Sequence, residues 1–109
     1  MSKVYVVNGS TTTMYDDSTD FATASVHTTI SGAVKGLRAE IESRCVALKE
    51  NLMEQFNDEN YADDFDGYNT FEEFWEDWIK DYTCTPTYWS YDTDDLSITV
   101  YIKEVELSN

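Results

Sequence analysis

Eight apolar residues between Ile30 and Phe56 recur at steps of three and four residues. In chain order they are Ile30, Val34, Leu37, Ile41, Cys45, Leu48, Leu52 and Phe56. This spacing places them on one side of an α-helix. We therefore predict one long helix over this segment, roughly 40 Å in length at about 1.5 Å per residue. Gly32 and Gly36 near its start indicate close packing of the helix on a sheet.

The segments before this helix have the composition of β-strands. The run from Lys3 to Val7 is rich in β-branched and aromatic residues, which predicts a buried central strand that ends at Asn8-Gly9-Ser10. The polar stretch from Thr11 to Asp20 is predicted to form a loop or hairpin turn. The stretch from Phe21 to His27 is predicted to form a second strand.

Thr70 and Glu73 mark the start of a second helix. Their spacing matches a capping box, in which each side chain binds backbone N–H groups at the helix start. The apolar residues that follow at helical spacing are predicted to pack as core against the sheet or the long helix: Phe71, Phe74, Trp75, Trp78, Ile79 and Tyr82. The segment Cys84-Thr85-Pro86 is predicted to stop the helix, because the residue before a proline disfavours the helical conformation.

The last part of the chain is predicted to be a β-hairpin. Residues 87–91 and 96–107 form its strands, and the apolar pattern loses its phase after Ile102, which indicates a bulge near Lys103. The element order β-β-α-α-β-β predicts an α+β fold with a mostly antiparallel sheet of about four strands and two helices packed on one face. A length of 109 residues fits a single domain.

Negative charge is concentrated between Glu50 and Asp95. This segment holds fifteen acids against one lysine, together with twelve of the sixteen aromatic residues, in a chain whose net charge is −15. Acids clustered in one segment repel one another and destabilise the fold. This concentration of charge therefore favours a function in which the segment binds a positively charged partner. Adaptation to high salt would spread acids over the whole surface, whereas the long helix and both termini retain Lys and Arg.

Ten acids form the predicted partner-binding surface. They are Asp63, Asp64, Asp66, Glu72, Glu73, Glu76, Asp77, Asp92, Asp94 and Asp95. Those of the second helix repeat at intervals of one and four residues, which sets out two rows spaced about 6 Å along the helix axis. A nucleic-acid duplex also presents negative rows, with about one charge per 1.7 Å of axis. Any exposed aromatic residue among the acids would serve as an interface anchor; the candidates are Tyr61, Phe65, Tyr68, Tyr88, Trp89 and Tyr91.

Two segments carry a resemblance to a known class of proteins. Asp63-Asp64-Phe65-Asp66 and Phe71-Glu72-Glu73-Phe74-Trp75-Glu76-Asp77-Trp78, in a short acidic chain rich in Tyr and Trp, resemble the small DNA-mimic inhibitors of bacteriophages, of the anti-restriction and anti-CRISPR kind. The resemblance covers mainly residues 50–95. It implies a non-enzymatic inhibitor of a basic nucleic-acid-binding host protein, such as a CRISPR effector or a restriction enzyme. It implies no direct binding of nucleic acid or membrane, and it leaves a homodimer open.

Two other functions remain as alternatives. One is an immunity or antitoxin-like protein that neutralises a basic toxin or nuclease, since such a protein also presents acids with aromatic anchors. The other is a calcium-binding adaptor, because Gly67 at loop position six places Asp64, Asp66 and Glu73 at positions three, five and twelve of a helix-loop-helix site. Position one falls on Ala62, however, so we predict no specific metal site.

The sequence favours a protein without catalytic residues or a cofactor. His27 is the sole histidine, which excludes a two-histidine metal site, and it lies at a predicted strand end. Cys45 and Cys84 belong to no metal-binding cluster and are predicted to be free thiols. The opening apolar run is too short for a signal peptide, and no segment approaches the ~20 apolar residues of a membrane span, so we expect a cytoplasmic protein, in the host bacterium if a phage encodes it.

Overall fold

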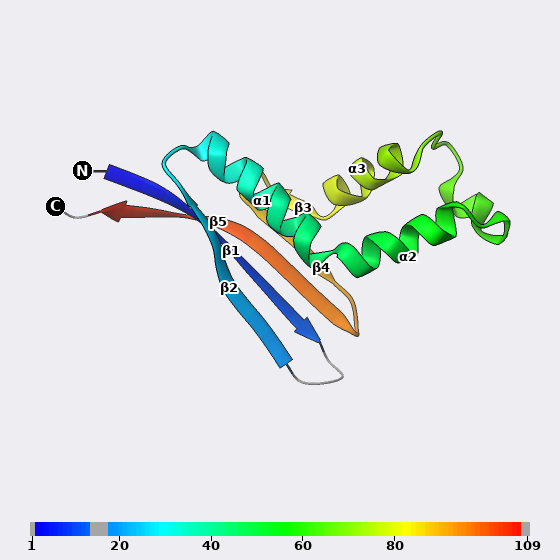
Figure 1. Cartoon of the computed structure of the whole chain (residues 1–109), viewed down its shortest axis with the longest axis horizontal. Coiled ribbons are helices and arrows are strands. Elements are labelled where there is room, and N and C mark those ends of the chain that lie inside the picture. The colour runs from blue at the N-terminus through cyan, green and yellow to red at the C-terminus, as the bar shows by residue number, and fades with distance from the viewer. Residues whose placement is uncertain (1, 14–17, 108–109) are drawn as a thin grey trace. The chain divides into compact units, whose positions relative to one another are not determined.

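The computed structural model describes residues 2–13 and 18–107, whose course Figure 1 shows. Within these residues the chain forms two compact units. The sheet unit comprises the chain up to Arg44 together with the chain from Thr83 onwards, and the helical unit comprises Cys45–Tyr82. The helical unit holds twelve acids against two lysines and so carries −10 of the total charge of −15.

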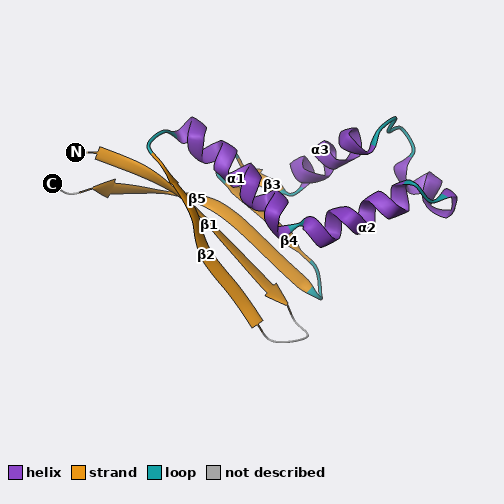
Figure 2. Cartoon of the chain, viewed as in Figure 1, coloured by secondary structure: helices purple, strands orange, loops and turns teal. Residues whose placement is uncertain are grey.

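The sheet unit is built on a five-stranded antiparallel sheet, counted over the described residues, in the order β2-β1-β5-β4-β3 (Figure 2). Its strands are β1 (Ser2–Thr13), β2 (Ser18–His27), β3 (Thr83–Thr85), β4 (Tyr88–Asp92) and β5 (Leu96–Leu107). The predicted α+β class and antiparallel sheet are confirmed. The predicted number of about four strands omits β3, because this three-residue strand contains no apolar run that would reveal it.

Four helical segments lie in the described part of the chain, where two helices were predicted. They are α1 (Ile30–Arg44), α2 (Val46–Phe56), the 3₁₀ helix η1 (Glu59–Phe65) and α3 (Phe71–Asp81). Helix α1 belongs to the sheet unit and packs on β1, β2 and β5. The other three make up the helical unit.

The prediction of one long helix from Ile30 to Phe56 is wrong, because the helix is interrupted at Cys45. This residue has φ −103° and ψ 15°, away from helical values of about −63° and −42°. Arg44, the last residue of α1, donates hydrogen bonds to Thr11 Oγ1 (2.6 Å) and to the carbonyl oxygen of Gly9 (3.0 Å), which ties this end of α1 to β1. The apolar spacing continues across Cys45, so the pattern contains no sign of the break.

Strands β1 and β5 pair in register from Ser2 with Leu107 to Thr13 with Leu96, without a shift. Strand β1 lies inside the sheet, as predicted, but it continues through Asn8-Gly9-Ser10, where the sequence predicted its end. The predicted bulge near Lys103 is wrong. Beyond Lys103 the apolar residues of β5 change phase because they lie on the opposite face of the sheet, not because the pairing slips.

The hairpin that joins β1 to β2 is tighter than predicted. Residues Thr11–Thr13 belong to β1, and β2 begins at Ser18 rather than at Phe21. Residues 14–17, which complete the predicted loop, lie outside the described residues. The β1–β2 pairing has a bulge between Val7 and Asn8, and the β3–β4 pairing shifts its register between Thr83 and Thr85.

The face of the sheet toward α1 forms the core of the sheet unit. The least exposed strand side chains there are Val7, Trp89, Ile98 and Val100. From α1 the buried residues are Ala33, Leu37 and Ile41. Gly36 confirms the predicted close packing of the helix, because a Cβ at this position would lie 2.5 Å from His27 Nε2 and 2.9 Å from Ser25 Oγ on β2.

Aromatic rings form the core of the helical unit. Phe56 of α2 contacts Phe65 of η1 and Phe71 of α3, with ring centroids 5.4 Å and 5.9 Å apart. Phe71, Trp75 and Ile79 are buried, which confirms their prediction as core, and Phe74, Trp78 and Tyr82 are half-buried. Helix α3 therefore packs on the segment that was predicted as the second half of the long helix.

Candidate functional site

All ten acids of the predicted partner-binding surface are exposed. The helical unit carries Asp63, Asp64, Asp66, Glu72, Glu73, Glu76 and Asp77. The sheet unit carries Asp92, Asp94 and Asp95, at the turn between β4 and β5. The set therefore divides into a helical group of seven and a turn group of three.

Helix α3 has an apolar side and an exposed side that carries five acids and, in its last turn, Lys80. Glu72, Glu73, Glu76, Asp77 and Asp81 are exposed, whereas the aromatic residues and Ile79 between them are buried or half-buried. Acids four residues apart lie one above the other at about 6 Å along the axis. On the opposite side, Phe71 and Phe74 of α3 contact Phe56 of α2 and Phe65 of η1, so the carboxylates project from a packed helix rather than from a loop.

Glu73 has a structural role besides its charge. The hydroxyl of Thr70 accepts a hydrogen bond from the backbone N–H of Glu73 (3.2 Å), and Glu73 Oε2 accepts one from the N–H of Asn69 (3.1 Å). The predicted capping box is confirmed, with the reciprocal bond made to Asn69 instead of Thr70. The carboxylate also lies in the first turn, where the helix dipole favours negative charge.

Asp77 and Asp92 likewise bind neighbouring side chains. Tyr68 donates its hydroxyl to Asp77 Oδ2 (2.9 Å). This hydrogen bond, followed by desolvation and the negative charges of Asp77 and Asp81, raises the pKa of Tyr68 above its usual 10.0. In the turn group, Ser97 donates its hydroxyl to Asp92 Oδ1. Charge changes at Glu73, Asp77 and Asp92 would therefore alter local structure as well as charge.

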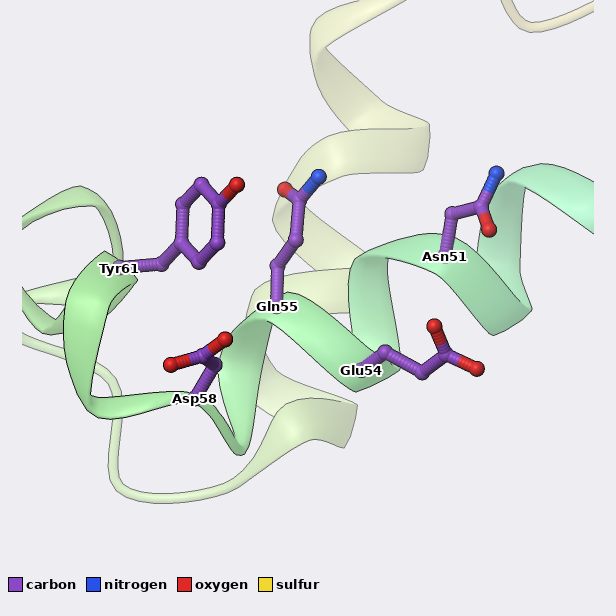
Figure 3. Close-up of a pocket in the computed structure, with 5 residues that line it drawn as sticks. All are labelled: Asn51, Glu54, Gln55, Asp58 and Tyr61. Carbon is purple, nitrogen blue, oxygen red and sulfur yellow. The ribbon is translucent and has the colours of Figure 1, made fainter.

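An open pocket of about 310 Å³ lies between α2 and η1 in the helical unit. Its lining residues are Asn51, Glu54, Gln55, Asp58 and Tyr61. Figure 3 shows the side chain of Tyr61 extending toward the side on which Gln55 rises from α2, with the carboxylate of Asp58 below the tyrosine ring in this view. Carboxylates beside an aromatic ring suit a cationic side chain, which the ring attracts through its quadrupole. Tyr61 was among the predicted interface aromatics, whereas the predicted ten acids include none of the other four, although the spacing of residues 51, 54 and 55 indicates a single polar face of α2.

The candidate interface aromatics differ in exposure. Tyr61 and Tyr88 are exposed, Tyr68 and Tyr91 are half-buried, and Phe65 and Trp89 are buried. Tyr61 belongs to the helical unit and Tyr88 to the sheet unit. The two buried rings are therefore core residues and cannot serve as anchors without unfolding.

The segment that resembles a calcium loop has another local structure. Loop positions one to three, Ala62 to Asp64, lie in the 3₁₀ helix η1. Gly67 adopts a positive φ of 96°, a conformation that favours glycine in the turn toward α3. Over the described residues, no group of three or more His, Cys, Asp and Glu side chains is arranged to hold a metal ion.

His27 and the cysteines occupy structural positions. His27 ends β2, as predicted, and its Nε2 lies 2.7 Å from Ser25 Oγ, while Nδ1 faces Gly32 of α1. This ring fills the space that the glycines of α1 leave. Cys45 is buried and Cys84 exposed.

In the described part of the chain, no helix is both long and apolar enough to span a membrane.

Comparisons with known proteins give no relative. No protein-family model matches the chain, and no curated protein or solved structure matches it.

Proposed function

We propose that this protein is a non-enzymatic inhibitor that mimics nucleic acid and occupies the basic nucleic-acid-binding groove of a host defence or DNA-processing protein. The observation that carries the proposal is the acidic side of α3, whose exposed carboxylates project in two rows from an aromatic core. A basic groove attracts a duplex chiefly through the field of its phosphates. A rigid surface of carboxylates offers the same field without bases or sugars.

Two further features support this function. The charge is concentrated in the helical unit, at −10 of −15, so attraction to a basic partner acts mainly on that unit. The pocket beside Tyr61 is open and acidic, and it suits a lysine or arginine of the partner. The helical unit thus offers charged groups and an exposed aromatic ring, and protein interfaces combine polar groups with aromatic anchors.

The test is a comparison of two double charge reversals. Asp64→Lys with Glu72→Lys changes the helical group, whereas Glu104→Lys with Glu106→Lys changes exposed acids of β5 that lie outside the set. Both variants change the net charge equally. The partner is isolated from a bacterial lysate at low salt, purified, and titrated with each variant. We expect the first variant to lose binding and the second to stay within about threefold of the unchanged protein.

Salt and competing DNA complete the experiment. Binding should weaken steeply as salt rises, because screening shortens the range of the carboxylate field. Excess duplex DNA should displace the protein from its partner, since both occupy one groove. An immunity-type inhibitor that docks beside the groove would resist displacement. Binding that is insensitive to salt, or equal for both double variants, would refute the proposed mechanism.

A further inference from the structure

Strand β2 leaves one edge of the sheet open. Among the described residues β2 pairs with β1 alone, so no strand pairs with the other side of this ten-residue strand. The carbonyl oxygen of Asp20 accepts a hydrogen bond from Arg44 (3.4 Å). The opposite edge, β3, has three residues and is followed by Pro86, which limits further pairing. Strand β2 contains neither proline nor lysine, the residues that commonly protect an edge.

This edge is also nearly neutral in a strongly acidic chain. Its one acid, Asp20, lies 3.7 Å from Arg44, and the rest of the strand consists of polar and apolar residues with His27 at the end. Two copies of a chain with a charge of −15 repel each other over most of their surface. Along β2, with one acid in ten residues, the local repulsion is low.

The bulge in the β1–β2 pairing places two exposed apolar side chains on one face. Ala24 is the extra residue, since Ser25 is opposite Val7 and Thr23 is opposite Asn8. In an unbroken strand, residues 21 and 26 would lie on opposite faces. Here Phe21 and Val26 pair with residues 10 and 6 of the regular strand β1 and so share the face away from α1, each 58% exposed.

We propose that two copies of this protein form a two-fold symmetric dimer by antiparallel pairing of their β2 strands. With the axis between residues 23 and 24, Phe21 of each copy lies opposite Val26 of the other. The same register places Asp20 opposite His27 of the other copy, a carboxylate opposite an imidazole. Each contact occurs twice, as two-fold symmetry requires. The two sheets become one continuous sheet of ten strands.

The space beside the edge is compatible with this arrangement. An open cavity of about 280 Å³ lies between β2 and α1 and is lined by Ala24, Ser25 and His27 of the strand. Side chains of an added strand that face α1, such as Asp20 of the other copy, have room there. The Asp20 side chain is 80% exposed, so it is accessible for this contact.

Sedimentation over a concentration series tests the dimer with a matched pair of variants. Phe21→Lys with Val26→Lys changes the proposed contact, whereas Tyr88→Lys with Leu107→Lys changes exposed apolar residues on the same sheet face in β4 and β5. Both variants add two positive charges. We expect the first to raise the dimer dissociation constant at least about tenfold and the second to change it by less than about threefold.

Disulfide trapping tests the register. In a Cys84→Ser background, Phe21→Cys with Val26→Cys should form a covalent dimer on oxidation, because each new cysteine faces its counterpart in the other copy. Phe21→Cys alone should not, since symmetric copies of residue 21 are offset by five residues, about 16 Å, which is beyond the reach of a disulfide. Within one strand the two cysteines are equally far apart, so an internal bond cannot compete.

Salt separates this inference from the proposed function. Screening reduces the repulsion between two acidic copies, so the dimer should strengthen as salt rises, whereas binding of a basic partner should weaken. A protein that sediments as a monomer at every concentration and salt level would overturn the proposal. Equal effects of the two lysine pairs, or trapping by Phe21→Cys alone, would also overturn it.

Discussion

The cap of α3 allows charge and hydrogen bonding to be separated at a single acid of the candidate site. Glu73 accepts a hydrogen bond from the N–H of Asn69 at 3.1 Å and adds a negative charge to the first helical turn. Glu73→Gln keeps an oxygen acceptor of the same length and removes the charge. Glu73→Ala removes both, so the difference between the two variants reports the hydrogen bond.

The expected magnitudes follow from these contacts. The exposed hydrogen bond contributes about 0.5–1.5 kcal/mol, and the charge at the helix start contributes about 0.3–1 kcal/mol. Repulsion between Glu73 and the like charge of Asp77, four residues further along α3, offsets about 0.2–0.5 kcal/mol of the contribution that the charge makes at the helix start. Glu73→Ala should therefore lower the free energy of unfolding by about 1–2 kcal/mol, and Glu73→Gln by less than about 0.5 kcal/mol.

Urea unfolding followed by the fluorescence of Trp75 and Trp78 measures both variants, because these rings lie on α3 itself. Glu72→Ala and Glu72→Gln are the controls. Glu72 is also in the first turn but has no part in the capping box, so these two should agree within about 0.5 kcal/mol. If alanine and glutamine at position 73 destabilise the protein equally, the assigned cap is refuted. Both variants should weaken partner binding alike, since each removes one charge.

Three other predictions test contacts in the two units. Because the pKa of Tyr68 is raised in the folded protein, the stability that its hydroxyl contributes is present below about pH 10 and is lost as the pH rises through the pKa of the folded state. Asp77→Asn should lower the pKa of Tyr68, which a titration followed by tyrosinate absorbance measures. Gly36→Ala should destabilise by about 1–3 kcal/mol in thermal unfolding, because its Cβ would lie 2.5 Å from an imidazole nitrogen. Gly32→Ala should destabilise less, because its Cβ would lie 3.1 Å from its nearest atom. Arg44→Lys should lower the free energy of urea unfolding by about 1–3 kcal/mol, because one ammonium nitrogen replaces the two nitrogens, Nη1 and Nη2, that bind Thr11 and Gly9 separately. An unchanged free energy of unfolding would contradict this role of Arg44.

Local signals in the sequence predicted the parts of the candidate site that depend on local interactions. The start of α3 at Thr70 follows from a cap that involves neighbours three residues away, and the two sides of the helix follow from its period. The exposure of the ten acids follows from their chemistry, because an unpaired carboxylate is costly to bury. The sequence predicted the capping role of Glu73 but not the hydrogen bonds of Asp77 and Asp92. Their partners, Tyr68 and Ser97, lie outside the elements that carry these acids.

The composition, the concentration of acids, the α+β class and the start of α3 were determined by the sequence alone, because each depends on residue type or on neighbours within a few positions. Helix α3 ends at Asp81, before the predicted stop at Cys84-Thr85-Pro86, because Thr83–Thr85 pair with β4. Tertiary structure decided the interruption at Cys45, the continuation of β1 through Gly9 and the shared face of Phe21 and Val26. Arg44 and Gly9 are 35 residues apart, and a strand bulge exists only relative to its paired strand. Such contacts leave no periodic trace in the chain, because they depend on which distant segments the folded sheet brings together.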